Sequence, residues 1–233
     1  MRNLDPKRVF VLCMFGAALV MSLPGSAVAG LAPVAVWHME GLGADGHTMR
    51  DSSSSRPANE GATTDIKVVN GWVRNGYKFN GSTSRVAVPD HGSLDPGGQP
   101  IRIVTYAKFR FRPDSGVYVL LTKGVVAKPN YKVLIDSQGE AVCSFRGRMS
   151  SAKVTSARLA TRKRHQIICG KVDRRIWIRV DGTKTVRKVR IGRISNVRRL
   201  LLGTGYRGGS HFRGGLDETT IQIGIAVAQT PVP

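Results

Sequence analysis

The sequence has few of the residues on which hydrolytic enzymes depend. It holds only four glutamates, Glu40, Glu60, Glu140 and Glu218, and they lie far apart. Glycoside hydrolysis needs two carboxyl groups that flank the scissile bond, so this scarcity argues against that chemistry. The chain also lacks a Gly-x-Ser-x-Gly elbow, which would present a serine nucleophile. We therefore expect a protein that binds its partner without transforming it.

Metal-binding motifs are scarce as well. The five histidines show no His-Glu-x-x-His run or comparable spacing. We expect each of them to be a loop or strand-surface residue. These histidines are His38, His47, His91, His165 and His211.

The N-terminus has the three-part layout of a secretory signal peptide. Basic residues precede an apolar run at 9–23, and Ala27-Val28-Ala29 is a small-x-small triplet suited to signal peptidase. A retained membrane anchor is the weaker alternative, because the apolar run is short for a bilayer span and Pro24-Gly25 ends it. We predict a signal peptide at 1–29, no stable membrane span after cleavage, and a secreted protein that is extracellular or associated with the cell envelope.

Cysteine is also scarce in this sequence. Cys13 lies in the predicted signal peptide, which leaves Cys143 and Cys169 as an even pair in an exported chain. Disulfides form and persist in that setting. Each cysteine lies within a predicted strand, at 141–145 and 165–169, so a bond between them is sterically plausible. We predict this disulfide, with metal binding by two isolated cysteines as the weaker alternative.

Helical periodicity and low-complexity linkers are missing, and short alternating segments take their place. In 101–111 an apolar or small residue stands at every second position, and the residues between them include Arg102, Lys108 and Arg110. In 176–180 the same period precedes Asp181-Gly182, the strongest short hairpin signal. A succession of short strands with turn residues between them is typical of a β-sandwich. We predict one all-β domain at 30–224 and a C-terminal tail at 225–233.

The segment Gly71–Asp90, GWVRNGYKFNGSTSRVAVPD, carries the clearest local pattern. Its side-chain period predicts a strand, a turn at Asn80-Gly81, a second strand and a stop at Pro89. Two aromatic residues and two valines would face one core. These four residues are Tyr77, Phe79, Val86 and Val88.

The same segment resembles the laminin G-like branch of the concanavalin A-like lectin and glucanase superfamily. Bacterial members often carry a stretch close to G-N-A-Y-x-F-N-G-x-x-x-x-V-x-V-P. Two later pieces, IWIRVDG at 176–182 and FRGGLDE at 212–218, are similar to the family's late hairpin and to its closing strand. The resemblance covers about 34–223 and implies an antiparallel jelly-roll β-sandwich. The residues that match the first stretch are Asn75, Gly76, Tyr77, Phe79, Asn80, Gly81, Val86, Val88 and Pro89.

The resemblance also implies a structural calcium ion. The laminin G-like pattern often places calcium between the loop after the first strand and the closing strand. These positions map onto Asp51 and Asp217 here, with Asn59 as a weaker candidate. Carboxylate and amide oxygens are ligands that calcium accepts from loops separated in sequence. The alternative is that Asp51 forms a local turn and Asp217 caps a strand end.

Carbohydrate binding is the function that the resemblance implies. Glucanases of the superfamily usually carry their carboxylates in a Glu-x-Asp-x-x-Glu run, and no glutamate of this chain lies in one. Stacking a pyranose needs an exposed aromatic ring. Trp177 and Tyr206 are preferred, since Trp177 faces away from three aliphatic residues and Tyr206 lies in a Gly-rich loop. The other candidates are Trp72, Tyr106 and Tyr118.

Charge supports a second hypothesis. The formal net charge is +21, and the first 29 residues contribute three cations and one acid, so 21 − 3 + 1 leaves +19 for the mature chain. Such a charge attracts polyanions without specific nucleic-acid readout. The protein would then be a cationic envelope or adhesion protein that binds an anionic surface polymer. The alternative is that the basic side chains lie on a solvated surface and have no binding role. The strand residues expected to carry polyanion contact are Lys108, Arg110, Lys184, Arg187, Lys188 and Arg190.

Overall fold

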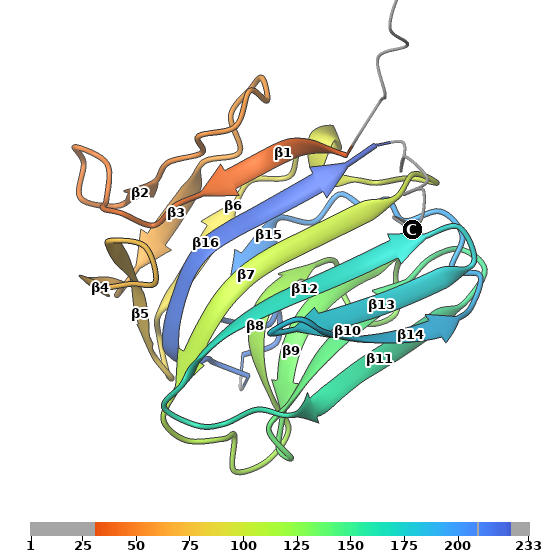
Figure 1. Ribbon diagram of the computed structural model, residues 1–233. Helices are drawn as coiled ribbons and strands as arrows, with labels where there is room; N and C mark the ends of the chain where they lie inside the picture. The colour runs from red at the N-terminus through yellow and green to blue at the C-terminus, as the bar shows by residue number, and fades with distance from the viewer. Residues whose placement is uncertain (1–30, 209, 225–233) are drawn as a thin grey trace, which may run out of the picture.

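The computed structural model describes residues 31–208 and 210–224, and its regular structure is almost entirely β-strand. Two antiparallel sheets of eight strands are stacked on each other (Figure 1). This arrangement confirms the predicted all-β jelly-roll sandwich. Sheet A runs in the order β14 (Thr183–Lys188), β13 (Arg175–Val180), β12 (Arg164–Val172), β7 (Ile101–Phe109), β16 (Arg213–Ile223), β5 (Asn75–Asn80) and β4 (Lys67–Asn70), with β1 (Ala32–Trp37) also paired to β16. Sheet B runs in the order β11 (Ser151–Arg158), β10 (Glu140–Arg146), β9 (Asn130–Asp136), β8 (Val117–Lys123), β15 (Leu200–Leu202), β6 (Arg85–Val88), β3 (Gly61–Thr64) and β2 (Thr48–Met49). A single turn of 3-10 helix, η1 (Gly92–Leu94), follows β6.

The core lies between the sheets and is built by alternating strand positions. In β7 the residues Ile101, Ile103, Ala107 and Phe109 are buried, and the residues between them face outward. The alternation expected for 101–111 is therefore confirmed as far as Phe109. The expectation fails at Phe111, which lies beyond the end of the strand and is 47% exposed.

The two layers are joined covalently. Cys143 of β10 in sheet B is bonded to Cys169 of β12 in sheet A, with Cα atoms 5.6 Å apart, which confirms the predicted disulfide. Both cysteines are fully buried. The bridge therefore connects strands that share no hydrogen-bonded ladder.

The Gly71–Asp90 segment forms its two strands, but they do not pair with each other. β5 belongs to sheet A and β6 to sheet B, so the predicted turn at Asn80-Gly81 carries the chain from one layer to the other and does not form a hairpin. Asn80 Oδ1 accepts hydrogen bonds from the backbone N–H groups of Ser82, Thr83 and Ser84, which turns the chain sharply. The expectation that Tyr77, Phe79, Val86 and Val88 share one core is confirmed, since each is at most 1% exposed.

The Asp-Gly hairpin is confirmed. Asp181 and Gly182 have φ values of +48° and +91°, and they connect β13 to β14 in an antiparallel pair. Two successive positive φ values match the twist of a two-residue hairpin turn. β14 is an edge strand of sheet A, and all six of its residues are exposed.

The predicted signal peptide and the C-terminal tail lie outside the described residues. Among the residues that are described, no helix is long and apolar enough to cross a membrane.

Candidate functional site

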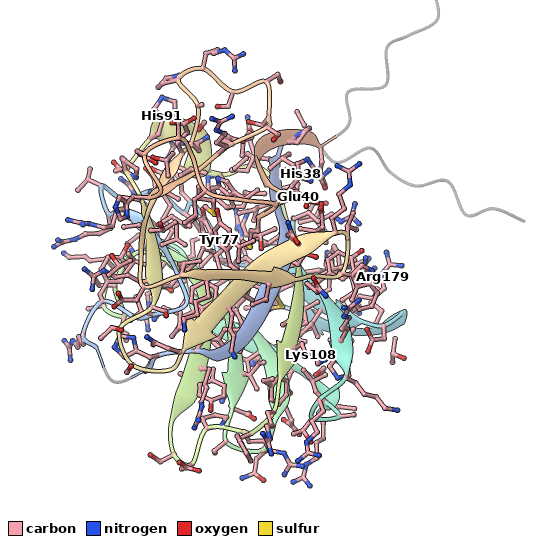
Figure 2. The ribbon with its side chains drawn as sticks, turned by 90° about the vertical axis from the view of Figure 1, so that its left-hand side faces the viewer. His38, Glu40, Tyr77, His91, Lys108 and Arg179 are labelled. Atoms are coloured by element: carbon pink, nitrogen blue, oxygen red, sulfur yellow. A yellow bond between two sulfur atoms is a disulfide. The ribbon has the colours of Figure 1, made fainter. Side chains whose placement is uncertain are left out.

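A cleft of about 600 Å³ lies on the outer face of sheet A, the face turned away from sheet B. Residues of β5, β16 and β7 form its floor, and the turn between β4 and β5 forms one wall. Figure 2 shows Lys108 of β7 on the sheet A side of the molecule and Tyr77 between the layers. A volume of this size falls within the range of small-molecule sites.

Two aromatic rings stand at one side of the cleft. The ring centroids of Trp72 and Tyr106 lie 4.6 Å apart with their planes inclined by 41°. Trp72 is 41% exposed although it is a large apolar side chain. The Tyr106 hydroxyl accepts a hydrogen bond from Gln166 Nε2 on the neighbouring strand. An exposed tryptophan beside a half-buried tyrosine with a fixed hydroxyl can stack against a sugar ring and hydrogen-bond the sugar's hydroxyls.

The turn that carries Trp72 is shaped by its sequence. Gly71 N–H donates to the carbonyl of Arg74, and Arg74 has a positive φ of 49°. A Cβ on Gly71 would lie 2.1 Å from the backbone oxygen of Asn75, so only glycine fits at this position.

Asp217 of β16 holds this turn against the sheet. Its Oδ2 accepts the backbone N–H of Trp72 and, at 2.9 Å, that of Val73, while its Oδ1 accepts the N–H of Glu218. Burial raises the pKa of Asp217, and the N–H donors of Val73, Trp72 and Glu218 oppose that increase. Asp217 is therefore a positioning residue for the aromatic pair.

The charged residues that line the cleft are basic with one exception. Asp217 supplies the only carboxylate among the described lining residues, and it is 4% exposed. A glycosidase needs two carboxyl groups that flank the bond to be cleaved. The arrangement is suited to binding. The lining cations are Lys78, Lys108, Arg110, Arg162 and Arg164.

Four basic residues of sheet A lie in one line across its strands, and three of them, Lys78, Lys108 and Arg164, line the cleft. Strand pairing aligns Lys67 with Lys78, Lys78 with Gly215, Gly215 with Lys108, and Lys108 with Arg164. The four charged residues are exposed, and paired residues of neighbouring strands project to the same face. We call Lys67, Lys78, Lys108 and Arg164 the cationic row. Gly215 lies at its centre.

The residues expected to bind polyanions fall into two groups. Lys108 and Arg110 line the cleft, whereas the others lie on β14 or just beyond it. Arg187 reaches from β14 to donate to the carbonyl of Lys153 on β11, so it joins the edges of the two sheets. The other members of the second group are Lys184, Lys188 and Arg190.

The preferred aromatic residues lie outside the cleft. Trp177 is on the outer face of sheet A, as its alternation with buried neighbours predicted, and its indole lies flat over Gly170 with Lys184 Nζ 4.9 Å from the ring centroid. Tyr206 is half-buried, and its hydroxyl donates to the carbonyl of Arg199 and accepts the N–H of Gly124. Burial raises the pKa of Tyr206. Ligand binding by Trp177 and Tyr206 stays a prediction.

The calcium candidates are engaged by protein donors. Asp51 accepts hydrogen bonds from the backbone N–H groups of Val36, Ser53 and Asn59 and from the Ser53 hydroxyl. Asn59 is 2% exposed and donates to the carbonyl of Val34. Asp217 serves the Trp72 turn, and the described residues contain no group of three or more His, Cys, Asp or Glu side chains that could hold a metal ion. A calcium ion at these residues stays a prediction, and it would have to displace N–H donors.

The sequence pattern predicts the outward orientation of one aromatic residue of this site, Tyr106. Tyr106 alternates with the core residues of β7, so it had to face outward beside Lys108. The orientation of Trp72 could not be predicted in this way, because Trp72 lies in a turn, where side chains do not alternate between two faces. The cationic row was also hidden, because its members come from four strands and align only through the strand register.

Comparison with known proteins supports the fold. No protein-family model matches the chain, and no curated protein matches it in sequence. Among solved structures, the binding domain of Paraclostridial Mosquitocidal Protein 1 is similar, with a TM-score of 0.68 and 14% identity over 84% of this chain and 49% of that one. Domain 4 of AbnA, an extracellular GH43 arabinanase from Geobacillus stearothermophilus solved with arabinotriose, gives a TM-score of 0.65 and 13% identity over 85% of this chain and 95% of that domain.

A third similar structure is the binding domain of Botulinum Neurotoxin DC in complex with SialylT. Its TM-score is 0.62 and its identity 10%, over 82% of this chain and 48% of that one. The chain thus spans about half the length of the toxin domains and nearly all of the arabinanase domain. At these identities the likeness concerns the fold, and the laminin G-like branch in particular stays a resemblance. The chain has the β-sandwich fold of these three domains.

Proposed function

We propose that this protein is a secreted, non-catalytic carbohydrate-binding module whose ligand occupies the cleft on sheet A. The observation that carries the proposal is the exposed Trp72, paired with the half-buried Tyr106, at the side of a cleft with a glycine-rich floor. Aromatic rings offer sugars a flat apolar surface, and a large exposed tryptophan in a soluble protein otherwise has a cost.

The floor of the cleft fits the same role. Gly76 and Gly215 lie on neighbouring strands and are among the lining residues. A Cβ on Gly76 would stand 2.9 Å from the carbonyl oxygen of Leu216. Glycine at position 76 therefore allows the Trp72 turn and Asp217 to lie close over β5, whereas at Gly215 the space above the strand is open to a ligand.

The similar structures support this function without supplying it. One is described in complex with arabinotriose and another with SialylT. The buried disulfide is compatible with an exported protein, because such bonds persist in oxidising compartments.

The test is Trp72→Ala, with Trp177→Ala as the matched control. Binding is first located on a glycan array, and affinities for the best glycan are then measured by titration calorimetry. Truncation of a tryptophan at the centre of a binding site typically costs 2 kcal/mol or more, about a 30-fold loss of affinity. We expect this loss for Trp72→Ala and less than a threefold change for Trp177→Ala. The reverse result would move the site to the other end of sheet A, and unchanged affinity in both variants would refute the proposal.

A second candidate function is charge-driven binding of polyanions along β14. The observation that favours it is an edge strand with all six residues exposed, among them Lys184, Arg187 and Lys188. Binding of this kind weakens steeply with salt, because it depends on the release of counterions. An affinity that persists from 0.15 to 0.5 M NaCl would favour the cleft, and a loss of 100-fold or more would favour β14.

A further inference from the structure

We propose that the carbohydrate bound by the cleft is acidic, and that its carboxylate or sulfate lies over Gly215 between Lys78 and Lys108. This inference rests on the proposed function, because the cleft must bind a sugar before the charge of that sugar matters.

The cationic row places like charges directly opposite each other. Lys67 faces Lys78 across the β4–β5 ladder, and Lys108 faces Arg164 across the β7–β12 ladder. Like charges at directly opposite positions destabilise a sheet. Among the described residues, no carboxylate forms an ion pair with any of the four. A bound anion would remove this repulsion.

Edge protection explains only one member of the row, Lys67, which lies on the edge strand β4. Lysine on an edge strand prevents pairing between sheets, and that accounts for Lys184 and Lys188 on β14. Lys78, Lys108 and Arg164 lie on β5, β7 and β12, each of which has a strand on both sides. Charges on these inner strands have no such structural role.

The one carboxylate among the residues that line the cleft is also engaged. Asp217 lies on β16, two residues after Gly215, and its register partner on β7 is Tyr106. Both of its oxygens accept N–H groups, from Trp72 and Val73 on one side and from Glu218 on the other. Its charge is therefore used to fix the aromatic turn.

Gly215 leaves room for an anion at the centre of the row. The nearest heavy atom to a Cβ built on Gly215 is the Tyr77 carbonyl oxygen at 3.9 Å, so the space above it is open. Lys78 and Lys108 lie on the two strands that flank it, which places their backbones about 10 Å apart at the usual strand spacing. Two flexible ammonium groups can converge on one anion from this separation.

The aromatic pair lies next to the same point. Tyr106 is two residues from Lys108 along β7, about 7 Å away. The Arg164 guanidinium lies 5.9 Å from the centre of the Trp72 ring. One sugar unit can therefore stack on the aromatic pair while its acidic substituent reaches Gly215.

The first test compares two double variants on one array at 0.5 M NaCl. The array carries neutral glycans beside their uronic-acid, sialylated and sulfated counterparts. We expect the wild-type protein to bind an acidic glycan at least tenfold more tightly than its neutral counterpart. Lys78→Gln/Lys108→Gln should abolish that preference, whereas Lys184→Gln/Lys188→Gln, which removes the same charge from β14, should keep it. The carboxylated and sulfated arms identify the anionic group.

Each other outcome has a defined meaning. Equal binding of neutral and acidic glycans overturns this inference and leaves the proposed function standing. Equal loss in both double variants assigns the preference to overall charge and also overturns it. Absence of binding to any glycan refutes the proposed function and the inference together.

The second test uses the open position itself. Gly215→Gln and Gly215→Glu add side chains of nearly the same size, and neither meets a protein atom closer than ordinary contact at its Cβ. We expect Gly215→Glu to lower the affinity for the acidic glycan at least tenfold more than Gly215→Gln does, since its carboxylate takes the place of the anion. Equal losses would show that only space matters at Gly215, and the inference would be wrong. Unfolding curves of both variants check that the sandwich is intact.

Discussion

Lysine side chains are neutralised in one region of this protein and left side by side in another. Lys123 is completely buried near η1, and its ammonium group lies 2.7 Å from Asp90 Oδ1, 2.9 Å from Asp95 Oδ1 and 3.0 Å from the carbonyl oxygen of Asn196. Lys108, on the outer face of sheet A, faces Arg164 instead. The charge of Lys123 is neutralised by acids of the protein itself, and the outer face of sheet A presents charge that an external anion can neutralise.

The difference shows which lysine the protein neutralises with its few carboxylates. A buried ammonium without partners is costly, so Asp90 and Asp95 are placed against Lys123. An exposed ammonium is hydrated and needs no partner to be tolerated. The charge of the outer face is therefore free to serve binding, and stability rests on the interior.

Removal of the disulfide should have the largest effect on stability. The bridged cysteines are 26 residues apart in sequence, and the chain-entropy model gives about 3.5 kcal/mol for a loop of that length. Cys143→Ala/Cys169→Ala should lower the free energy of unfolding by this amount in urea titrations followed by circular dichroism. Either single variant should lose nearly as much as the double, because one cysteine cannot form the bond. A loss below about 1 kcal/mol would show that the ladders alone hold the layers together.

Loss of the buried ammonium should have the next largest effect. Lys123→Met keeps an apolar chain of similar length but leaves Asp90 and Asp95 without their cation. Breaking a buried ion pair costs roughly 3 to 5 kcal/mol, and we expect about 3 kcal/mol because both carboxylates are partly exposed. Urea unfolding of Lys123→Met and of Lys184→Met on the edge strand provides the comparison. Equal stability of the two variants would remove the contrast between the interior and the outer face.

Asp217 connects the two regions, because it is buried but serves the outer face. Asp217→Asn replaces one acceptor oxygen with an amide group that points donors at the N–H groups of Trp72, Val73 or Glu218. Hydrogen bonds to a charged group contribute about 1.5 to 3 kcal/mol, so we expect a stability loss of about 2 kcal/mol. The fluorescence of Trp72 should shift, and glycan affinity should fall with it. If stability falls while affinity is unchanged, the Trp72 turn does not form the binding site.

The fold was predictable because its signals are local. Alternation along β7 and the Asp181-Gly182 turn each fix a strand or a hairpin within about ten residues. The two cysteines outside the predicted signal peptide had only one way to pair with each other. The Asn80-Gly81 turn shows the limit of such signals. The dipeptide predicts a sharp turn, but whether the next strand joins the same sheet depends on distant partners, here β16 and β15.

The candidate site was less predictable because strand register creates it. Lys78, Lys108 and Arg164 are separated by tens of residues and meet only through β16 and the β7–β12 ladder. Asp217 was predicted to bind calcium on the basis of a resemblance, and the structure shows its carboxylate holding a turn whose position no sequence pattern gives.

The smallest effect concerns the stability of the cationic row itself. Lys108→Gln removes one of two like charges at directly opposite positions, so it should stabilise the protein by about 0.2 to 1 kcal/mol in low salt. The gain should shrink as NaCl rises, because salt screens exposed charges. Adding an acidic glycan should reverse the order, since the ligand stabilises the wild-type protein more than the variant. Thermal melting at 20 and 500 mM NaCl, with and without the glycan, measures the stabilisation by Lys108→Gln, its dependence on salt and the effect of the ligand. If Lys108→Gln instead destabilises the protein in low salt, Lys108 contributes to the sheet, and the row has a structural role that binding need not explain.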